Sequence, residues 1–322
     1  MDLSIIIPAY NERFLSKTIE NILENIEGDT EVIAVCDNYW PDPPVKDNPR
    51  VTLVHRNRTH GQRASTNDGA KLSRAKYIAK TDAHCGFDKG FDVKLMADMK
   101  DDWTIAPVMR NLWGFDWVCE NGHRRYQGPS SEFCMVSDGK KLIRNESCDS
   151  KVVKREMHWI GKTNPQNDSY CFNSEPQFKY FREYRSRPEY QEALKTGLTE
   201  SMSLQGSFFM LTRDKYWELN ICDENFGSWG SQGIEVAAKT WLSGGKVMVS
   251  HKTWYAHMFR TQGGDFGFPY PQEDRKVKEN RALAKEYFFN NKFDKAVHPL
   301  SWLLEKFAPV PGWTQEDLDK LK

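Results

Sequence analysis

The sequence lacks the long apolar run that a membrane-spanning helix requires. No stretch of the 322 residues approaches the roughly 18–20 consecutive apolar positions of such a helix. The first residues lead directly into a predicted strand and offer neither a basic leader nor a cleavage site. We therefore expect a cytoplasmic protein without a membrane segment.

The chain also lacks an excess of charge of either sign. Lys plus Arg and Asp plus Glu both number 45, so the formal net charge is zero. This balance gives no global signature of binding to nucleic acid or to an anionic membrane surface. The densest local group of basic side chains lies in residues 140–155, where acidic neighbours dilute it.

Closely spaced cysteine pairs are absent. The seven cysteines stand at positions 36, 85, 119, 134, 148, 171 and 222 and include no CxxC pair. Reduced thiols fit this odd number and wide spacing better than a disulfide framework does. Cys119, His123, Cys134 and Cys148 could together hold zinc, but their spacing gives that site no support.

Alternating strand and helix patterns in the first third of the chain predict an α/β fold. Apolar runs typical of buried parallel strands, with helical patterns among them, occur at residues 3–7, 31–36, 51–55 and 77–79. Sheets built this way bind ligands at the carboxyl ends of their strands. Pro8, Asp37 and Asp82 fall at such ends.

Regular patterns return in the second half of the chain. They predict strands at 206–211, 246–250 and 253–260, and helices at 214–219, 234–242 and 274–290, the second after a Gly-rich loop over 226–233. Between residues 111 and 200 the pattern is too mixed to assign elements. An insert that recognises an acceptor could lie there.

Asp82 and His84 are the first candidates for chemistry. They follow a short predicted strand, and alternate side chains of an extended chain point to the same side. A carboxylate and an imidazole on one side suit a divalent cation, with positions left open for phosphate oxygens. Taken alone, the pair fits equally an Asp that caps a turn beside an unrelated His.

The order of the motifs resembles that of glycosyltransferases with the GT-A fold. Residues 4–12 (SIIIPAYNE) are similar to the family 2 opening, and residues 81–85 (TDAHC) resemble the Asp-x-His (DXH) motif of polypeptide N-acetylgalactosaminyltransferases. Downstream, residues 206–209 (GSFF), 229–235 (WGSQGIE) and 257–260 (HMFR) are similar to segments of the same family, in the same order.

This resemblance implies a Rossmann-like nucleotide-diphospho-sugar transferase fold with a mixed central sheet and an acceptor-side insert. It divides the chain into a nucleotide-sugar-binding half, an insert or acceptor-side region, a catalytic half with a lid, and a C-terminal tail packed on the domain. These parts are residues 1–110, 111–205, 206–290 and 291–322.

The resemblance also implies a metal site. Asp82, His84 and His257 would be the protein ligands of Mn²⁺ or Mg²⁺, which neutralises the departing diphosphate. Two imidazoles with one carboxylate favour Mn²⁺. Taken alone, His257 could be a histidine buried in the core on an alternating strand. The main structural expectation is therefore that His257 lies beside Asp82 and His84.

The remaining predicted site residues bind the donor or take part in catalysis. By resemblance, the nucleotide-sugar contacts are Pro8, Ala9, Tyr10, Glu12, Asp37, Gly61, Arg63, Asp82, Gly206, Trp229 and Tyr270. The predicted catalytic residues are Gln232, Glu235 and Arg260. Gln232 and Glu235 lie one helical turn apart and share a face, and Arg260 could hold the diphosphate. Each also has a structural alternative. Glu235 could simply be favoured at a helix start, Arg260 could form a surface ion pair, and Trp229 could pack beneath the helix.

We expect a metal-dependent glycosyltransferase that moves a hexose or N-acetylhexosamine from a UDP-sugar to a hydroxyl of a protein, a glycan or a modified DNA base. The family has Glu where this chain has Gln232, so one candidate base is lost and retention of configuration is favoured. A bacterial enzyme, or a phage enzyme in the host cytoplasm, fits this expectation. The alternatives are a phage-type DNA glycosyltransferase acting on hydroxymethylated pyrimidine bases and a non-catalytic nucleotide-sugar-binding module.

Overall fold

Strand β1 (Leu3–Ala9) lies inside the sheet because both of its faces are apolar and all of its residues are buried. It pairs in parallel with β2 (Thr30–Asp37) on one side and with β4 (Tyr77–Thr81) on the other, and β3 (Val51–Arg56) follows β2. The predicted parallel strands are therefore confirmed.

The computed structural model describes residues 1–137, 141–151, 153–163, 168–228, 230–259 and 274–321. Three predicted site residues, Trp229, Arg260 and Tyr270, lie outside these ranges. In the part of the chain that is described, no helix has the length and apolar character needed to cross a membrane.

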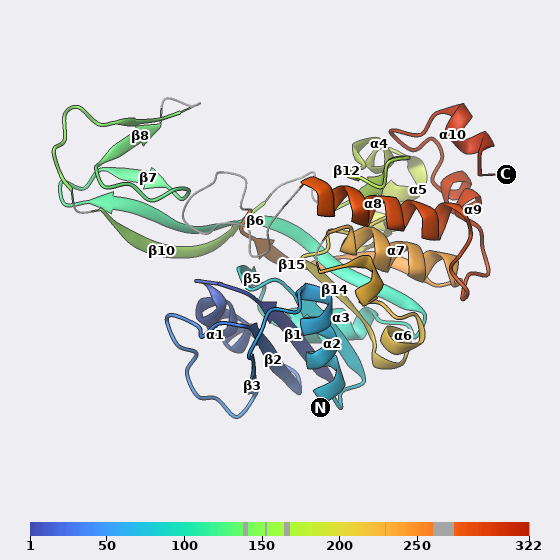
Figure 1. The fold of residues 1–322 in the computed structure, drawn as a ribbon, viewed down its shortest axis with the longest axis horizontal. Helices are drawn as coiled ribbons and strands as arrows, with labels where there is room; N and C mark the ends of the chain where they lie inside the picture. The colour runs from blue at the N-terminus through green and yellow to red at the C-terminus, as the bar shows by residue number, and fades with distance from the viewer. Residues whose placement is uncertain (138–140, 152, 164–167, 229, 260–273, 322) are drawn as a thin grey trace.

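The second half of the chain completes a mixed sheet, as predicted. Strand β14 (Phe208–Thr212) runs antiparallel to β4, whereas β15 (Lys246–His257) runs parallel to β6 (Trp103–Cys119). With β13 (Leu198–Glu200) at one edge, the strand order is β13-β15-β6-β14-β4-β1-β2-β3 (Figure 1). The carboxyl ends of β1, β2 and β4 therefore lie along the same edge.

The prediction of two strands over residues 246–260 was wrong. Both parts form the single strand β15, which pairs with β6 before and after an irregularity between Ser250 and Trp254. A bulge of this kind interrupts the alternation of side chains, and the interruption suggests a strand boundary in the sequence.

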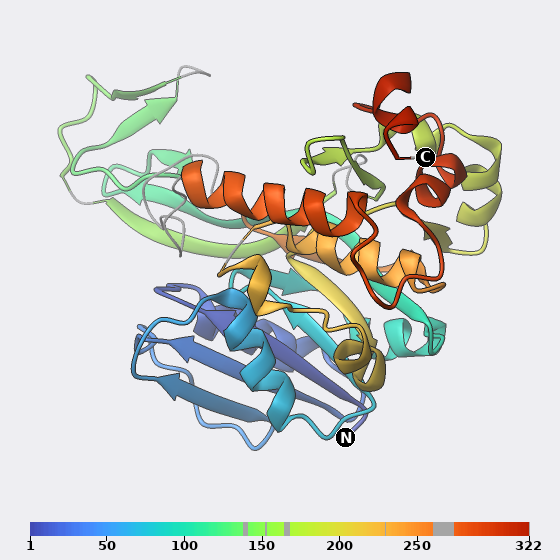
Figure 2. The ribbon, with the colours of Figure 1, turned by 45° about the vertical axis from the view of Figure 1, so that its right-hand side comes forward.

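A long two-stranded arm leaves the body of the protein (Figures 1 and 2). It consists of β6 and the antiparallel β10 (Val153–Lys162), and its tip carries β7 (Arg124–Tyr126), β8 (Met135–Ser137) and β9 (Leu142–Arg144). The arm accounts for much of the region in which the sequence pattern was too mixed to assign elements. The proposed division at residue 110 falls inside β6.

Helices cover both faces of the sheet. The elements not yet named are α1 (Leu15–Asn25), α2 (Gln62–Leu72), β5 (Cys85–Phe87), α3 (Phe91–Asp98), β11 (Tyr170–Phe172), β12 (Phe178–Tyr180), α4 (Arg182–Arg185), α5 (Pro188–Leu194), α6 (Arg213–Glu218), the 3₁₀ turn η1 (Glu224–Phe226), α7 (Gln232–Leu242), α8 (Asp274–Phe289), α9 (Leu300–Lys306) and α10 (Gln315–Asp319).

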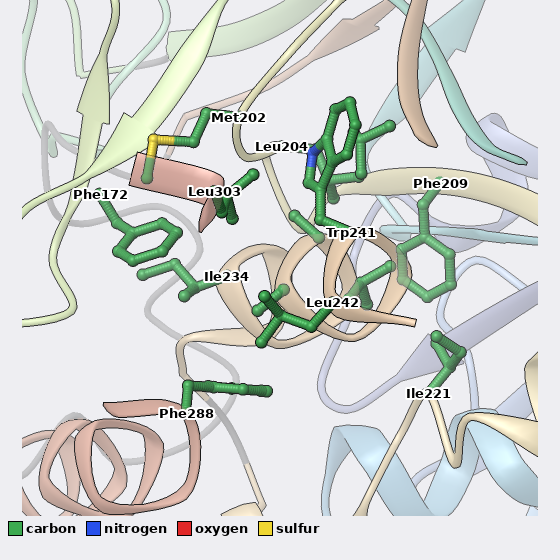
Figure 3. Packing of buried hydrophobic residues seen from close by; sticks show 14 of the residues in the cluster. Phe172, Met202, Leu204, Phe209, Ile221, Ile234, Trp241, Leu242, Phe288 and Leu303 are labelled. Carbon is green, nitrogen blue, oxygen red and sulfur yellow. The ribbon is translucent and has the colours of Figure 1, made fainter. Parts of the chain in front are cut away.

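Helix α7 is the centre of the larger hydrophobic core. Trp241 and Ile234 project from it among Phe209 of β14, Phe288 of α8 and Leu303 of α9 (Figure 3). Trp241 is 1% exposed, and truncating such a side chain typically costs about 3–5 kcal/mol. This packing fixes the start of α7, where the candidate site lies.

Candidate functional site

Three side chains that lie far apart in the sequence meet beyond the carboxyl end of β4. Strand β5 pairs antiparallel with the end of β15, which places Cys85 opposite His257, and Asp82 and His84 come just before β5. The His257 Nε2 atom lies 3.2 Å from Asp82 Oδ2 and 3.1 Å from His84 Nε2. The structure therefore brings together the three predicted metal ligands.

The donor set of this triad suits a divalent cation. Ligand bonds of about 2.0–2.2 Å at right angles separate neighbouring ligand atoms by about 3 Å, close to the separations that His257 makes here. Burial lowers the pKa of His257 to about 4, so its imidazole is neutral at neutral pH and can bind a cation. His84 is also buried. Asp82, His84 and His257 thus fit Mn²⁺ or Mg²⁺.

Lys80 sets the charge state of Asp82. Burial by itself would raise the pKa of Asp82, but the Lys80 ammonium and the hydrogen bond from His257 hold it well below its usual range. Lys80 is fully buried, contacts Asp82 Oδ1 and donates to the Gly206 carbonyl at 2.8 Å. Sequence reasoning missed this residue, whose one signal was a lysine at the end of an apolar strand.

Glu12 holds the third member of the triad in place. Its Oε2 atom lies 3.3 Å from Nδ1 of His84, on the side of the ring away from His257. A carboxylate at this position orients a ligating imidazole. Glu12 also lines the neighbouring cavity, so both a positioning role and the predicted donor contact are open to it.

A cavity of about 360 Å³ opens beside the triad, a volume within the range of small-molecule sites. The predicted residues that line it are Pro8, Tyr10, Glu12, Asp82, His84, Gly206, Gln232 and His257. Sequence reasoning did not predict a further group of lining residues, which includes Gln62, Gln177, Phe178, Ser207, Phe259 and Arg281. The side chains from 177–178 form one wall, so the region between residues 111 and 205 contributes to the site. Their sequence carries no motif that could have indicated this.

Gln232 offers this cavity a hydrogen-bond acceptor. Its side chain is 5% exposed, its Nε2 atom donates to Cys222 Sγ at 3.3 Å, and its Oε1 atom is buried without a hydrogen-bond partner among the described residues. The start of α7 comes so close to the neighbouring chain that a Cβ at Gly233 would lie 2.0 Å from the Leu204 carbonyl oxygen. This close approach places Gln232 at the cavity wall.

Asp37 and Gly61 do not line the cavity but hold the backbone next to Gln62, which does. The Asp37 carboxylate accepts hydrogen bonds from the backbone N–H groups of His60 and Gly61, each at 2.9 Å. Gly61 has φ +101°, and a Cβ there would lie 2.4 Å from the Ser228 Cβ. These contacts fix the start of α2 against the loop that precedes α7. Ala9, also predicted as a contact, is buried in the core.

Arg63 and Glu235 pair with each other away from the cavity. Both are buried, and Arg63 Nε donates to Glu235 Oε2 at 2.8 Å. Arg63 Nη2 also donates to the Gly230 carbonyl at 2.6 Å, and Lys239 Nζ donates to Glu235 Oε1 at 2.9 Å. Lys239 and a loop carbonyl thus flank this pair, which ties the loop before α7 to helix α2.

Comparison with known proteins identifies a family model and relatives that resemble this chain. Residues 4–159 match the model of glycosyl transferase family 2. Polypeptide N-acetylgalactosaminyltransferase 3 of Drosophila melanogaster is 22% identical over 195 residues, which are 60% of this chain and 23% of that protein. N-acetylgalactosaminyltransferase 7 of Rattus norvegicus is 30% identical over 69 residues, which are 21% of this chain and 10% of that protein. The chain thus aligns with less than a quarter of the length of either relative.

Two solved structures share the fold over nearly the whole chain. The crystal structure of GalNAc-T7 with UDP, GalNAc and Mn²⁺ matches with a TM-score of 0.60 at 16% identity, covering 99% of this chain and 54% of that one. The crystal structure of S. aureus TarS 1-349 in complex with UDP-GlcNAc matches with a TM-score of 0.51 at 13% identity. The match covers 95% of this chain and 71% of that one. These likenesses confirm the fold that the sequence predicted.

Proposed function

We propose that the protein, whose residues 4–159 match the model of glycosyl transferase family 2, transfers a hexose or N-acetylhexosamine from a UDP-sugar to an acceptor hydroxyl in a metal-dependent reaction. The observation that carries this proposal is the meeting of Asp82, His84 and His257 at the wall of a cavity of about 360 Å³. The Mn²⁺ and UDP bound in the GalNAc-T7 structure support the same choice of cofactor and donor.

The chain's own residues prepare this cavity for a diphosphate. A bound Mn²⁺ or Mg²⁺ supplies positive charge where the leaving diphosphate becomes more negative. Lys80 keeps Asp82 ionised, and Glu12 orients His84, so the ligands are arranged before the donor arrives. Arg281 of α8 lines the same cavity and adds a second positive group.

We propose further that the reaction retains the anomeric configuration. Among the described residues that line the cavity, the carboxylates are Glu12 and Asp82, and they are engaged with His84 and with Lys80 respectively. Gln232 cannot act as a base. In the proposed step the bond from the anomeric carbon to the UDP oxygen breaks, the acceptor oxygen bonds to that carbon on the same face, and a donor phosphate oxygen takes the acceptor proton.

Gln232 is proposed to select the sugar. Its buried Oε1 atom lacks a partner among the described residues, and a hydroxyl or amide N–H of the donor sugar would satisfy it. Phe178 lines the same cavity and offers an aromatic face against which a sugar ring could pack.

The proposal is tested by UDP release. The full chain is incubated with UDP-GalNAc, UDP-GlcNAc or UDP-Glc, with Mn²⁺ or with EDTA, and with hydroxyl-bearing peptides, glycans or hydroxymethylated DNA, whose products are identified by mass spectrometry. We expect release with one donor sugar, only when Mn²⁺ is present, and a matching mass increase on one acceptor. No release above background with any donor would favour the non-catalytic binding module instead.

A further inference from the structure

Four side chains at the tip of the arm form a second cluster of possible metal ligands. The tip strands β7 and β8 lie well away from β5, which adjoins the first cluster (Figure 1). Cys119 lies at the end of β6, His123 in the turn that follows it, Cys134 just before β8, and Cys148 in the loop between β9 and β10. One ligand atom from each falls within 4.8 Å of the other three.

We propose that Cys119, His123, Cys134 and Cys148 bind one structural zinc ion. Tetrahedral coordination with Zn–S bonds of about 2.3 Å and Zn–N bonds of about 2.0–2.1 Å separates two sulfurs by about 3.8 Å, and a sulfur and a nitrogen by about 3.5 Å. Cys119 Sγ lies 3.8 Å from Cys148 Sγ and 3.5 Å from His123 Nδ1. Three thiols and one imidazole are a common donor set of closed zinc sites.

Hydrogen bonds to the sulfur atoms support a site built to hold thiolates. The side-chain amide of Asn121 donates to Cys148 Sγ at 3.3 Å, and that of Asn145 lies 3.6 Å from Cys134 Sγ. N–H donors of this kind stabilise charged ligands around a metal and fix their direction.

The tip needs such a cross-link because it has little other core. Among the described residues from 119 to 153, the buried apolar side chains are those of the three cysteines, Cys119, Cys134 and Cys148. The partly buried Val153 packs against them. A segment this small cannot bury enough apolar surface to hold three short strands together. Zinc binding supplies that folding free energy in other small modules.

The two sites differ in their ligands, so a measurement that detects metal–thiolate bonds distinguishes them. The tip offers soft thiolates, which favour zinc, whereas the cavity offers the Asp82 carboxylate and the imidazoles of His84 and His257, which also accept harder cations such as Mn²⁺. The spacing C-x₃-H-x₁₀-C-x₁₃-C contains no close cysteine pair, which is why the sequence alone named these four residues as possible zinc ligands but gave the site no support.

The first test measures zinc in the purified full chain by mass spectrometry of the element. We expect about one zinc ion per chain in the wild type. His257→Asn should keep it, because that substitution alters only the cavity site, and so should Cys171→Ala, which removes a buried thiol of the body. Cys134→Ser and Cys148→Ser should each lose most of the zinc.

A second test uses wild-type protein, so it does not depend on the folding of variants. After a chelator has removed the bound metal, adding Co²⁺ to the protein should produce the absorption of tetrahedral cobalt bound by thiolates. In a separate sample, removal of the metal should make three further cysteines reactive towards a thiol reagent. Chelation should also open residues 119–153 to proteolysis while the body stays intact. Any of three results would overturn the proposal. They are a wild type that has neither zinc nor the cobalt spectrum, an unchanged zinc content in both serine variants, and a Cys119–Cys148 disulfide in the purified protein.

Discussion

Lys80 shows how a single buried charge prepares the cavity. Removing an ammonium from water costs several kcal/mol unless good partners replace the lost hydration. Here the Asp82 carboxylate and the Gly206 carbonyl are those partners. The same arrangement keeps Asp82 ionised and therefore ready to bind a cation.

Lys80→Met should weaken Mn²⁺ binding and make it more sensitive to acid. Without the ammonium, burial raises the pKa of Asp82, so a proton competes with Mn²⁺ at a higher pH than in the wild type. We expect a loss of affinity of about 10–100-fold, as for other residues that support metal ligands. Titration with Mn²⁺ between pH 5 and pH 8 measures it, with the exposed Lys76→Met as the control. Identical affinity and pH dependence in both variants would contradict this role.

At the scale of elements, α7 and the loop before it depend on the buried pair of Arg63 and Glu235. Arg63 reaches from α2 to Glu235 and to the Gly230 carbonyl, while Lys239 donates to Glu235 from one turn further along α7. Because Gln232 stands at the start of the same helix, this network also positions a cavity residue.

Glu235→Gln should destabilise the protein strongly. The substitution leaves the buried Arg63 guanidinium without its carboxylate and Lys239 with only Asp223, 3.8 Å away, and breaking such a buried pair costs about 3–5 kcal/mol. Urea denaturation measures the free energy of unfolding. The control is Glu192→Gln, which removes an exposed ion pair with Lys195 and should cost less than about 1 kcal/mol. Similar losses in the two variants would exclude the structural role that we assign to Glu235.

Strand β15 carries a histidine that makes stability depend on pH. His251 lies beside Thr199 of β13, with Nε2 2.9 Å from the hydroxyl oxygen, and burial together with nearby Arg185 lowers its pKa to about 4. An unfolded histidine has a pKa near 6.5, so the unfolded chain binds more protons between these two values. Stability from this residue is therefore present above about pH 6.5 and is lost as the pH falls towards 4.

We expect His251 to account for a loss of about 2 kcal/mol in the free energy of unfolding between pH 7 and pH 5. His251→Gln cannot titrate and should lose that much less stability than the wild type over the same interval. Urea denaturation of both proteins at the two pH values, with metal removed, measures the difference. Parallel losses would show that His251 titrates normally in the folded protein.

The sequence predicted well those elements in which the order of apolar and polar residues is regular along the element itself. Strands such as β1 and β2 are continuous apolar runs because both faces are covered, and α7 has a regular apolar stripe closed by glycines. Strand β15 was divided in two because its bulge interrupts the pattern. The arm was not predicted, since β10 exposes most of its residues and has no buried face to generate a period.

At the scale of the whole molecule, the candidate site exists because two distant parts of the chain share one sheet edge. Asp82 follows β4, which belongs to the parallel half, whereas His257 ends β15 and reaches the site through its pairing with β5. The resemblance to known enzymes predicted this meeting. No local pattern could have shown that Lys80 supports Asp82 or that Arg63 pairs with Glu235, because those contacts exist only in the folded chain.

Binding of Mn²⁺ in the presence of UDP, followed by electron paramagnetic resonance, tests the central claim most directly. The matched variants are His257→Asn and His251→Gln, both on β15, with the second outside the cavity. The account predicts about one tightly bound Mn²⁺ per chain in the wild type and in His251→Gln, and binding weaker by about tenfold or more in His257→Asn. Equal binding by His257→Asn and the wild type would contradict a cation site formed by Asp82, His84 and His257.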